Sequence, residues 1–143
     1  MREIIATVLA SINCIACIGL TLWHIITLPN KLQNSPDEGE RKKAYDKACK
    51  RWELSLMLTT VIDVILLWKG GLKLVAEDIF YTILAVVALI FMILFRVYHQ
   101  IIEKKYNTQR YSSSQRKGNL GGGTFFGATL VMSVYQIVLL FLQ

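Results

Sequence analysis

Four long apolar runs, separated by charged connectors, constrain the fold of this chain more than any other feature. A helix needs about 20 apolar residues to cross the hydrocarbon core of a bilayer, because each residue adds about 1.5 Å. The sequence therefore predicts an all-α integral membrane protein, a bundle of four transmembrane helices in a single domain over residues 1–143. The expected spans are residues 4–28, 52–68, 79–95 with an extension to about 102, and 124–142.

Basic residues are concentrated in two connectors, residues 29–51 and 96–123, which hold thirteen of the sixteen lysines and arginines. Lysine and arginine beside membrane spans favour the cytoplasmic side, and four crossings place both connectors on one side. We therefore expect two basic cytoplasmic loops in contact with anionic lipids, and both termini on the non-cytoplasmic side. No recognition helix or aromatic platform is visible, so we expect no nucleic-acid partner.

The connector before the second run has a helical pattern. Ser35 as N-cap, Pro36 and two following acidic residues indicate a helix start. Apolar residues then recur at spacings of three and four, at Ala44, Tyr45, Ala48, Cys49 and Trp52. The pattern predicts an amphipathic cytoplasmic helix that leads into the second span, either lying on the membrane surface or continuous with the span.

Asp63 is the most unusual residue because it lies within the second apolar run. A carboxylate at this depth is either a proton or cation site, or a hydrogen-bonding group that fixes helix packing. Candidate partners at a similar depth are Tyr135 and Gln136 on the fourth run and Thr7 and Ser11 on the first.

Small and weakly polar residues follow one face of the first run. They recur at spacings of three and four: Ala6, Ala10, Asn13, Cys17, Thr21 and His24. Such a narrow face predicts a seam against which another helix packs closely. Gly123 and Gly127 on the fourth run are the expected partner of this seam.

The cysteines and histidines offer few metal ligands. Cys14 and Cys17 form a C-x-x-C pair inside an apolar helix, whereas a zinc site needs about four ligands, so we predict structural cysteines and no metal site. His24 and His99, the two histidines of the chain, fall at one level near the cytoplasmic interface. They are either axial ligands of a b-type haem or half-solvated interfacial side chains.

A small anionic ligand would find its most favourable position at that same level. Glu53, Arg96 and Tyr98 are expected there beside His24 and His99, under the basic connectors. An ordinary cytoplasmic interface contains the same residue types, so both interpretations stay open.

In outline, four spans, outside termini and a long basic first cytoplasmic connector resemble the membrane-associated eicosanoid and glutathione metabolism (MAPEG) family. The resemblance implies a membrane-embedded transferase that uses glutathione. The family's R-A-x-x-N-x-x-E signature is absent, because the corresponding stretch, residues 47–53, reads Lys-Ala-Cys-Lys-Arg-Trp-Glu.

Features that promote helix packing are strong in this sequence, and those that carry chemistry are weak. No catalytic triad motif or phosphate-binding loop is visible. We therefore expect a non-catalytic accessory or structural subunit of a membrane assembly, bound to other membrane subunits or to copies of itself, with no cofactor. The alternatives are a glutathione-dependent transferase, a haem-binding electron-transfer subunit, and a proton or ion transport component that uses Asp63.

Overall fold

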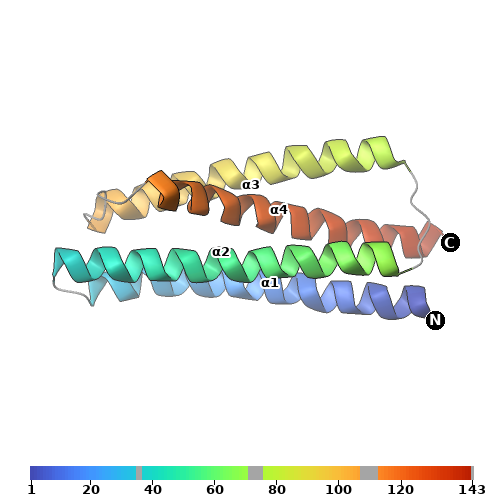
Figure 1. Ribbon diagram of the computed structural model, residues 1–143, viewed down its shortest axis with the longest axis horizontal. Helices are drawn as coiled ribbons and strands as arrows, with labels where there is room; N and C mark the ends of the chain where they lie inside the picture. The colour runs from blue at the N-terminus through green and yellow to red at the C-terminus, as the bar shows by residue number, and fades with distance from the viewer. Residues whose placement is uncertain (35–36, 71–75, 107–112, 143) are drawn as a thin grey trace.

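The computed structural model describes residues 1–34, 37–70, 76–106 and 113–142, and these residues form α-helices without any strand. The helices are α1 (Arg2–Gln33), α2 (Glu38–Lys69), α3 (Glu77–Tyr106) and α4 (Ser113–Leu142). They run alternately in opposite directions, so both termini lie at the same end of the bundle (Figure 1). The prediction of an all-α chain is confirmed.

Within the described ranges, three helical segments are long and apolar enough to cross a membrane: α1, α3 and the Gly122–Leu142 part of α4. α2 does not meet this criterion, because its first half is strongly charged and its apolar half still contains Glu53 and Asp63. Three such helices fit a multi-pass membrane protein.

Large apolar side chains line the outward surface of all four helices, among them Ile15, Leu58, Leu94 and Val134. Soluble monomers rarely expose apolar surface of this extent. In a bilayer the same side chains contact lipid, so the outer surface agrees with the lengths of the helices.

α4 lies against each of the other three helices. α1 and α2 pack along each other, whereas α3 packs mainly on α4 and touches α1 only locally. The bundle therefore has two parts, a group formed by α1, α2 and α4, and α3 attached to its α4 side.

The connectors 29–51 and 96–123 were predicted as basic loops, but the structure shows that they are largely helical. The prediction of loops is therefore wrong for most of their length. α1 continues to Gln33, α2 begins at Glu38, α3 ends at Tyr106 and α4 begins at Ser113. Apolar residues at helical spacing allow these charged segments to pack on one another and form a cluster: Leu28, Leu32, Tyr45, Ala48, Cys49 and Ile102.

The amphipathic segment is continuous with the apolar half of α2, which decides between the two arrangements that the sequence left open. Ser35 and Pro36, the predicted helix start, lie outside the described residues. Asp37 is the N-cap rather than a first-turn residue, and its Oδ1 accepts a hydrogen bond from the Gly39 N–H at 3.3 Å. A carboxylate at this position is favoured by the unpaired N–H groups of the first turn.

The α1 face predicted as a seam is buried against α2 and α4: Ala6, Ala10, Asn13, Cys17 and Thr21. Gly123 and Gly127, however, face α3. A Cβ at Gly127 would lie 2.8 Å from the Ala88 Cα, and one at Gly123 would lie 2.8 Å from the Met92 Cα, both on α3. The predicted pairing is therefore wrong, because the glycines face α3, where they allow two backbones to approach closely.

Candidate metal centre

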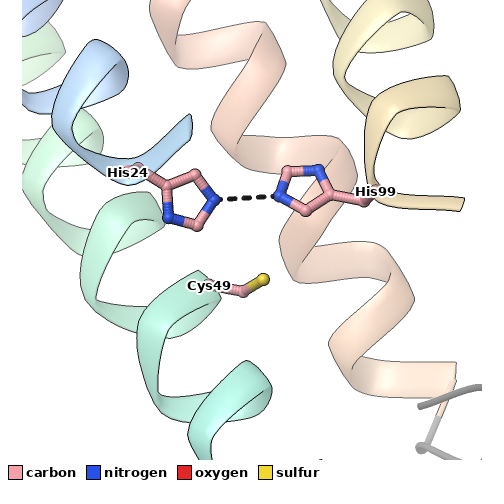
Figure 2. A group of neighbouring side chains, drawn as sticks. All are labelled: His24, Cys49 and His99. Carbon is pink, nitrogen blue, oxygen red and sulfur yellow. Dashed lines mark hydrogen bonds between the residues drawn. The ribbon is translucent and has the colours of Figure 1, made fainter. Parts of the chain in front are cut away.

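Three side chains that commonly bind transition metals meet in the half of the bundle away from the termini. They are His24 on α1, Cys49 on α2 and His99 on α3, and their ligand atoms lie within 4.8 Å of one another (Figure 2). All three residues are at least 95% buried. Three separate helices thus position a nitrogen, nitrogen and sulfur donor set around one point.

The two imidazoles are in direct contact, with 3.0 Å between their Nε2 atoms. His99 Nδ1 lies 2.7 Å from the carbonyl oxygen of Phe95, one turn earlier on α3. A neutral imidazole carries one N–H, so donation from Nδ1 to this carbonyl leaves His99 Nε2 as an acceptor with its lone pair towards His24. Metal-binding histidines are oriented by this kind of hydrogen bond at the second nitrogen.

His24 is held by the Trp52 indole. The two rings stack with 4.7 Å between their centroids and 2° between their planes. The Trp52 Nε1–H donates to Thr21 Oγ1 at 3.1 Å, which fixes the indole to α1. Gly122 on α4 leaves the space that the indole ring fills, since any Cβ at Gly122 would overlap it.

Cys49 lies beside a buried tyrosine and glutamate pair. The Tyr45 hydroxyl donates to Glu103 Oε1 at 2.7 Å, and both residues are buried. Burial raises the pKa of the Cys49 thiol. Burial, with Cys49 and Glu103 nearby, also raises the pKa of the Tyr45 phenol, so both groups carry their protons in the metal-free protein. A metal ion would have to displace the thiol proton.

The donor types suit a single ion such as Zn²⁺ or Cu⁺. The three ligand atoms lie within 4.8 Å of one another, so Cys49 Sγ would have to move closer to reach the roughly 3.5 Å between nitrogen and sulfur in a tetrahedral zinc site. With zinc–nitrogen bonds of about 2.0 Å and tetrahedral angles, two ligating nitrogens lie about 3.3 Å apart, close to the 3.0 Å between the two imidazoles. A haem iron with two axial imidazoles requires about 4 Å between the nitrogens on the same bond length, with a porphyrin between the rings. The rings of His24 and His99 would have to separate to admit one.

The remaining residues predicted at this level are distributed differently. Tyr98 lies next to His99, with 5.3 Å between ring centroids, and its hydroxyl donates to the Ile25 carbonyl of α1. Glu53 is half-buried and Arg96 is exposed. Within the described part of the chain, neither is hydrogen-bonded to the histidines.

Cys49 is a candidate ligand that the sequence did not predict, because the C-x-x-C pair on α1 is the more familiar metal-binding pattern. Its position carried a usable signal. Cys49 lies four residues after Tyr45 and three before Trp52, on the buried face of the amphipathic segment, so a helix continuous with the span places it at the level of His24.

A groove on the surface between α1 and α2 reaches this centre. It is partly open, and two cationic side chains, Lys31 and Arg51, belong to its wall. The full lining is Leu20, Trp23, His24, Thr27, Lys31, Ala48, Arg51, Trp52 and Ser55. One edge of the buried His24 is therefore accessible from the surface.

Asp63 belongs to a second buried polar cluster, which joins α1, α2 and α4. Asn13 Nδ2 donates to Asp63 Oδ1 at 2.9 Å and to the Thr59 carbonyl at 2.8 Å. Ser133 Oγ donates to Asp63 Oδ2 at 2.8 Å, and Gln136 Nε2 donates to the Asp63 backbone carbonyl at 3.3 Å. We call these five residues the Asp63 network.

Among the partners expected for Asp63, only Gln136 contacts it within the described residues. The Tyr135 ring stacks on Phe80 of α3, with 4.1 Å between centroids. The hydroxyls of Thr7 and Ser11 donate to carbonyl oxygens one turn earlier on their own helix. Tyr135, Thr7 and Ser11 were predicted from their depth in the membrane alone. The rotation of α1 and α4 about their axes turns Asn13 and Ser133 towards Asp63 instead.

Comparison with known proteins supplies no relative. No protein-family model matches the chain, and no curated protein and no solved structure matches it. The geometry of the two buried clusters is therefore the basis for assigning a function.

Proposed function

We propose that this chain is a four-span membrane protein that binds one transition-metal ion, Zn²⁺ or Cu⁺, through His24, Cys49 and His99. The observation that carries the proposal is the convergence of three buried donor atoms from three helices within 4.8 Å. Buried histidine and cysteine side chains are common singly, but this arrangement supplies most of a tetrahedral ligand set.

The surroundings of the centre support ligation. The Phe95 carbonyl orients His99, the Trp52 ring orients His24, and each of these contacts holds its imidazole in one direction. Two neutral imidazoles and one thiolate give a charge of −1, so a divalent ion leaves the centre at +1. The carboxyl group of Glu103 is buried beside Cys49 and interacts with it electrostatically.

The proposal includes α2 as the fourth span. Asp63, the charge that makes α2 unlike the other spans, is fully buried and so does not face lipid. Both termini share one end of the bundle (Figure 1), and the basic segments gather at the other end. Positive charge favours the cytoplasm, so the metal centre would lie near the cytoplasmic side, where anionic lipids contact the basic segments.

A bound ion in this position would act as a structural link. α3 packs mainly on α4 and meets α1 only near the two histidines. A metal ion coordinated by all three residues would strengthen the attachment of α3 to α1 and α2, which the Tyr98–Ile25 and Tyr45–Glu103 hydrogen bonds already join to it. This role agrees with the non-catalytic structural subunit expected from the sequence, which remains a proposal here.

The test is the metal content of the purified full chain, measured by mass spectrometry of the elements after growth with added zinc or copper. We expect about one ion per chain, and less than a tenth of that in Cys49→Ser and in His99→Ala. The matched control is Cys14→Ser, which removes a thiol from α1 outside the centre and should retain the ion.

Cobalt substitution gives a second readout. Co²⁺ bound to Cys49 should produce a thiolate charge-transfer band that Cys49→Ser removes and Cys14→Ser keeps. Equal metal content in the two serine variants, or no metal in the folded wild-type chain, would show that the three residues do not form a metal site.

A further inference from the structure

The Asp63 network, independent of the metal centre, contains a carboxylate without an opposite charge. Asp63 has no exposed surface, and its two carboxylate oxygens contact the neutral donors Asn13 and Ser133. Among the described residues no lysine, arginine or histidine pairs with it. An ionised carboxylate buried in apolar surroundings without a cation is strongly disfavoured.

A second observation in the same network points the same way. Gln136 is also fully buried, and while its Nε2 donates to the Asp63 carbonyl, its Oε1 has no hydrogen-bond partner. Buried acceptors of this kind are rare, and each calls for an explanation. The network is thus short of one positive charge and of one hydrogen-bond donor.

We propose that Asp63 is a proton-binding site inside the bundle. One proton adds to Oδ2 of the carboxylate and converts it to the neutral acid, which supplies the missing donor. The new O–H donates to Ser133 Oγ, which lies 2.8 Å away and, as a hydroxyl, can accept as well as donate.

Protonation also releases the hydrogen of the Ser133 hydroxyl for another acceptor. Ser133 and Gln136 are three residues apart on α4, so their side chains are neighbours on one face. The Ser133 hydrogen can then turn towards Gln136 Oε1, or towards the Cys14 thiol with which Ser133 already interacts. A single proton therefore supplies the missing positive charge and adds one hydrogen-bond donor to the network.

A proton fits this site better than a metal cation does. Hard cations need about six oxygen ligands, for Ca²⁺ at about 2.4 Å, and both Asp63 oxygens are already in contact with donors at 2.8–2.9 Å. A proton needs no added space, because the distance from Asp63 Oδ2 to Ser133 Oγ already suits an O–H···O bond.

The groups that face Asp63 leave it as the main titrating group. α1 presents Asn13 and the thiols of Cys14 and Cys17, which interact with it electrostatically. α4 presents Ser133 and Gln136, and α2 itself presents Thr59 near the same place. α3 packs on α4, and no described titratable side chain of α3 contacts Asp63.

Infrared spectroscopy of the full chain in lipid nanodiscs at neutral pH tests the proposal. We expect the C=O stretching band of a protonated carboxyl, shifted in D₂O and lost in Asp63→Asn. The control Asp78→Asn changes an exposed carboxylate at the start of α3 and should leave the band unchanged. A wild-type spectrum without the band would overturn the proposal.

Two further measurements cover the other outcomes. If Asp63→Asn fails to fold, wild-type protein labelled with ¹³C-aspartate must show the same band at lower frequency, and an unshifted band would count against Asp63. The spectrum is also recorded with sodium replaced by choline. A band that appears only without sodium would assign the site to a metal cation instead of a proton.

Discussion

Two helix interfaces in this bundle are built in different ways. Where α1, α2 and α4 meet, polar side chains join the helices through the Asp63 network. Where α3 meets α4, the described contacts are close backbone approach at Gly127 and Ala88 and aromatic packing, such as Phe91 on Phe126 with 4.9 Å between centroids. Lipid supplies no hydrophobic force between helices. Interhelical hydrogen bonds and close packing are two interactions that hold helices together in its absence.

The difference follows from the residues that each helix offers. Residues 83–95 of α3 contain no polar side chain, so this part of α3 gains mainly from dispersion and close fit. α2 carries Thr59, Thr60 and Asp63 on its apolar half, and these groups need partners when they leave water. A helix with polar groups in its apolar half therefore needs neighbours that supply hydrogen-bond partners. An apolar helix needs a neighbour that its backbone can approach closely.

Gly127→Leu should break the α3–α4 interface and produce the largest loss of stability. A Cβ at Gly127 would already lie 2.8 Å from the Ala88 Cα, and leucine adds three more carbons there. Overpacking of this kind costs about 3 kcal/mol. Unfolding in mixed micelles of mild detergent and dodecyl sulfate measures the free energy.

The matched control is Gly19→Leu on α1, where an added Cβ has no atom within 4 Å. This variant should keep wild-type stability. Equal losses in the two variants would mean that Gly127 is not at a close contact between α3 and α4.

Asn13→Ala should weaken the polar interface by less, about 2 kcal/mol, because it removes the donor of Asp63 Oδ1 and leaves a small cavity. Ser11→Ala provides the comparison. The Ser11 hydroxyl donates to its own helix at Thr7 and joins no second helix, so its loss should be close to zero in the same unfolding assay. An Asn13→Ala variant as stable as Ser11→Ala would show that the Asn13–Asp63 hydrogen bond does not stabilise this interface.

Much of the difference between the polar interface of α1, α2 and α4 and the apolar interface of α3 and α4 could be predicted from the sequence. Apolar runs gave the helices, and spacings of three and four gave the buried face of α1. These patterns report which face of a helix is small or polar, since the period of a helix fixes the direction of each side chain.

The choice of partner could not be predicted in this way. Gly127 was expected against the α1 seam, yet it contacts Ala88, because a small face fits any neighbour that comes close. Tyr135 and Ser133 have nearly the same depth, but two residues on a helix are about 200° apart, so only one of them can face Asp63. The relative rotation of helices is a tertiary property.

The proposed metal centre lies where the two parts of the bundle meet, and its affinity for zinc should depend on pH. Burial raises the pKa of the Cys49 thiol, so the thiol stays protonated at neutral pH and zinc must release that proton to bind. Below this pKa, each unit of falling pH therefore weakens binding about tenfold, or about 1.4 kcal/mol. The decrease becomes steeper where the imidazoles also take up protons.

Competition with a chromogenic zinc chelator between about pH 8 and pH 7 measures the slope. A wild-type affinity independent of pH would exclude Cys49 as a ligand and leave α3 joined to α1 by the contact of the two histidines and the hydrogen bond from Tyr98 to the Ile25 carbonyl.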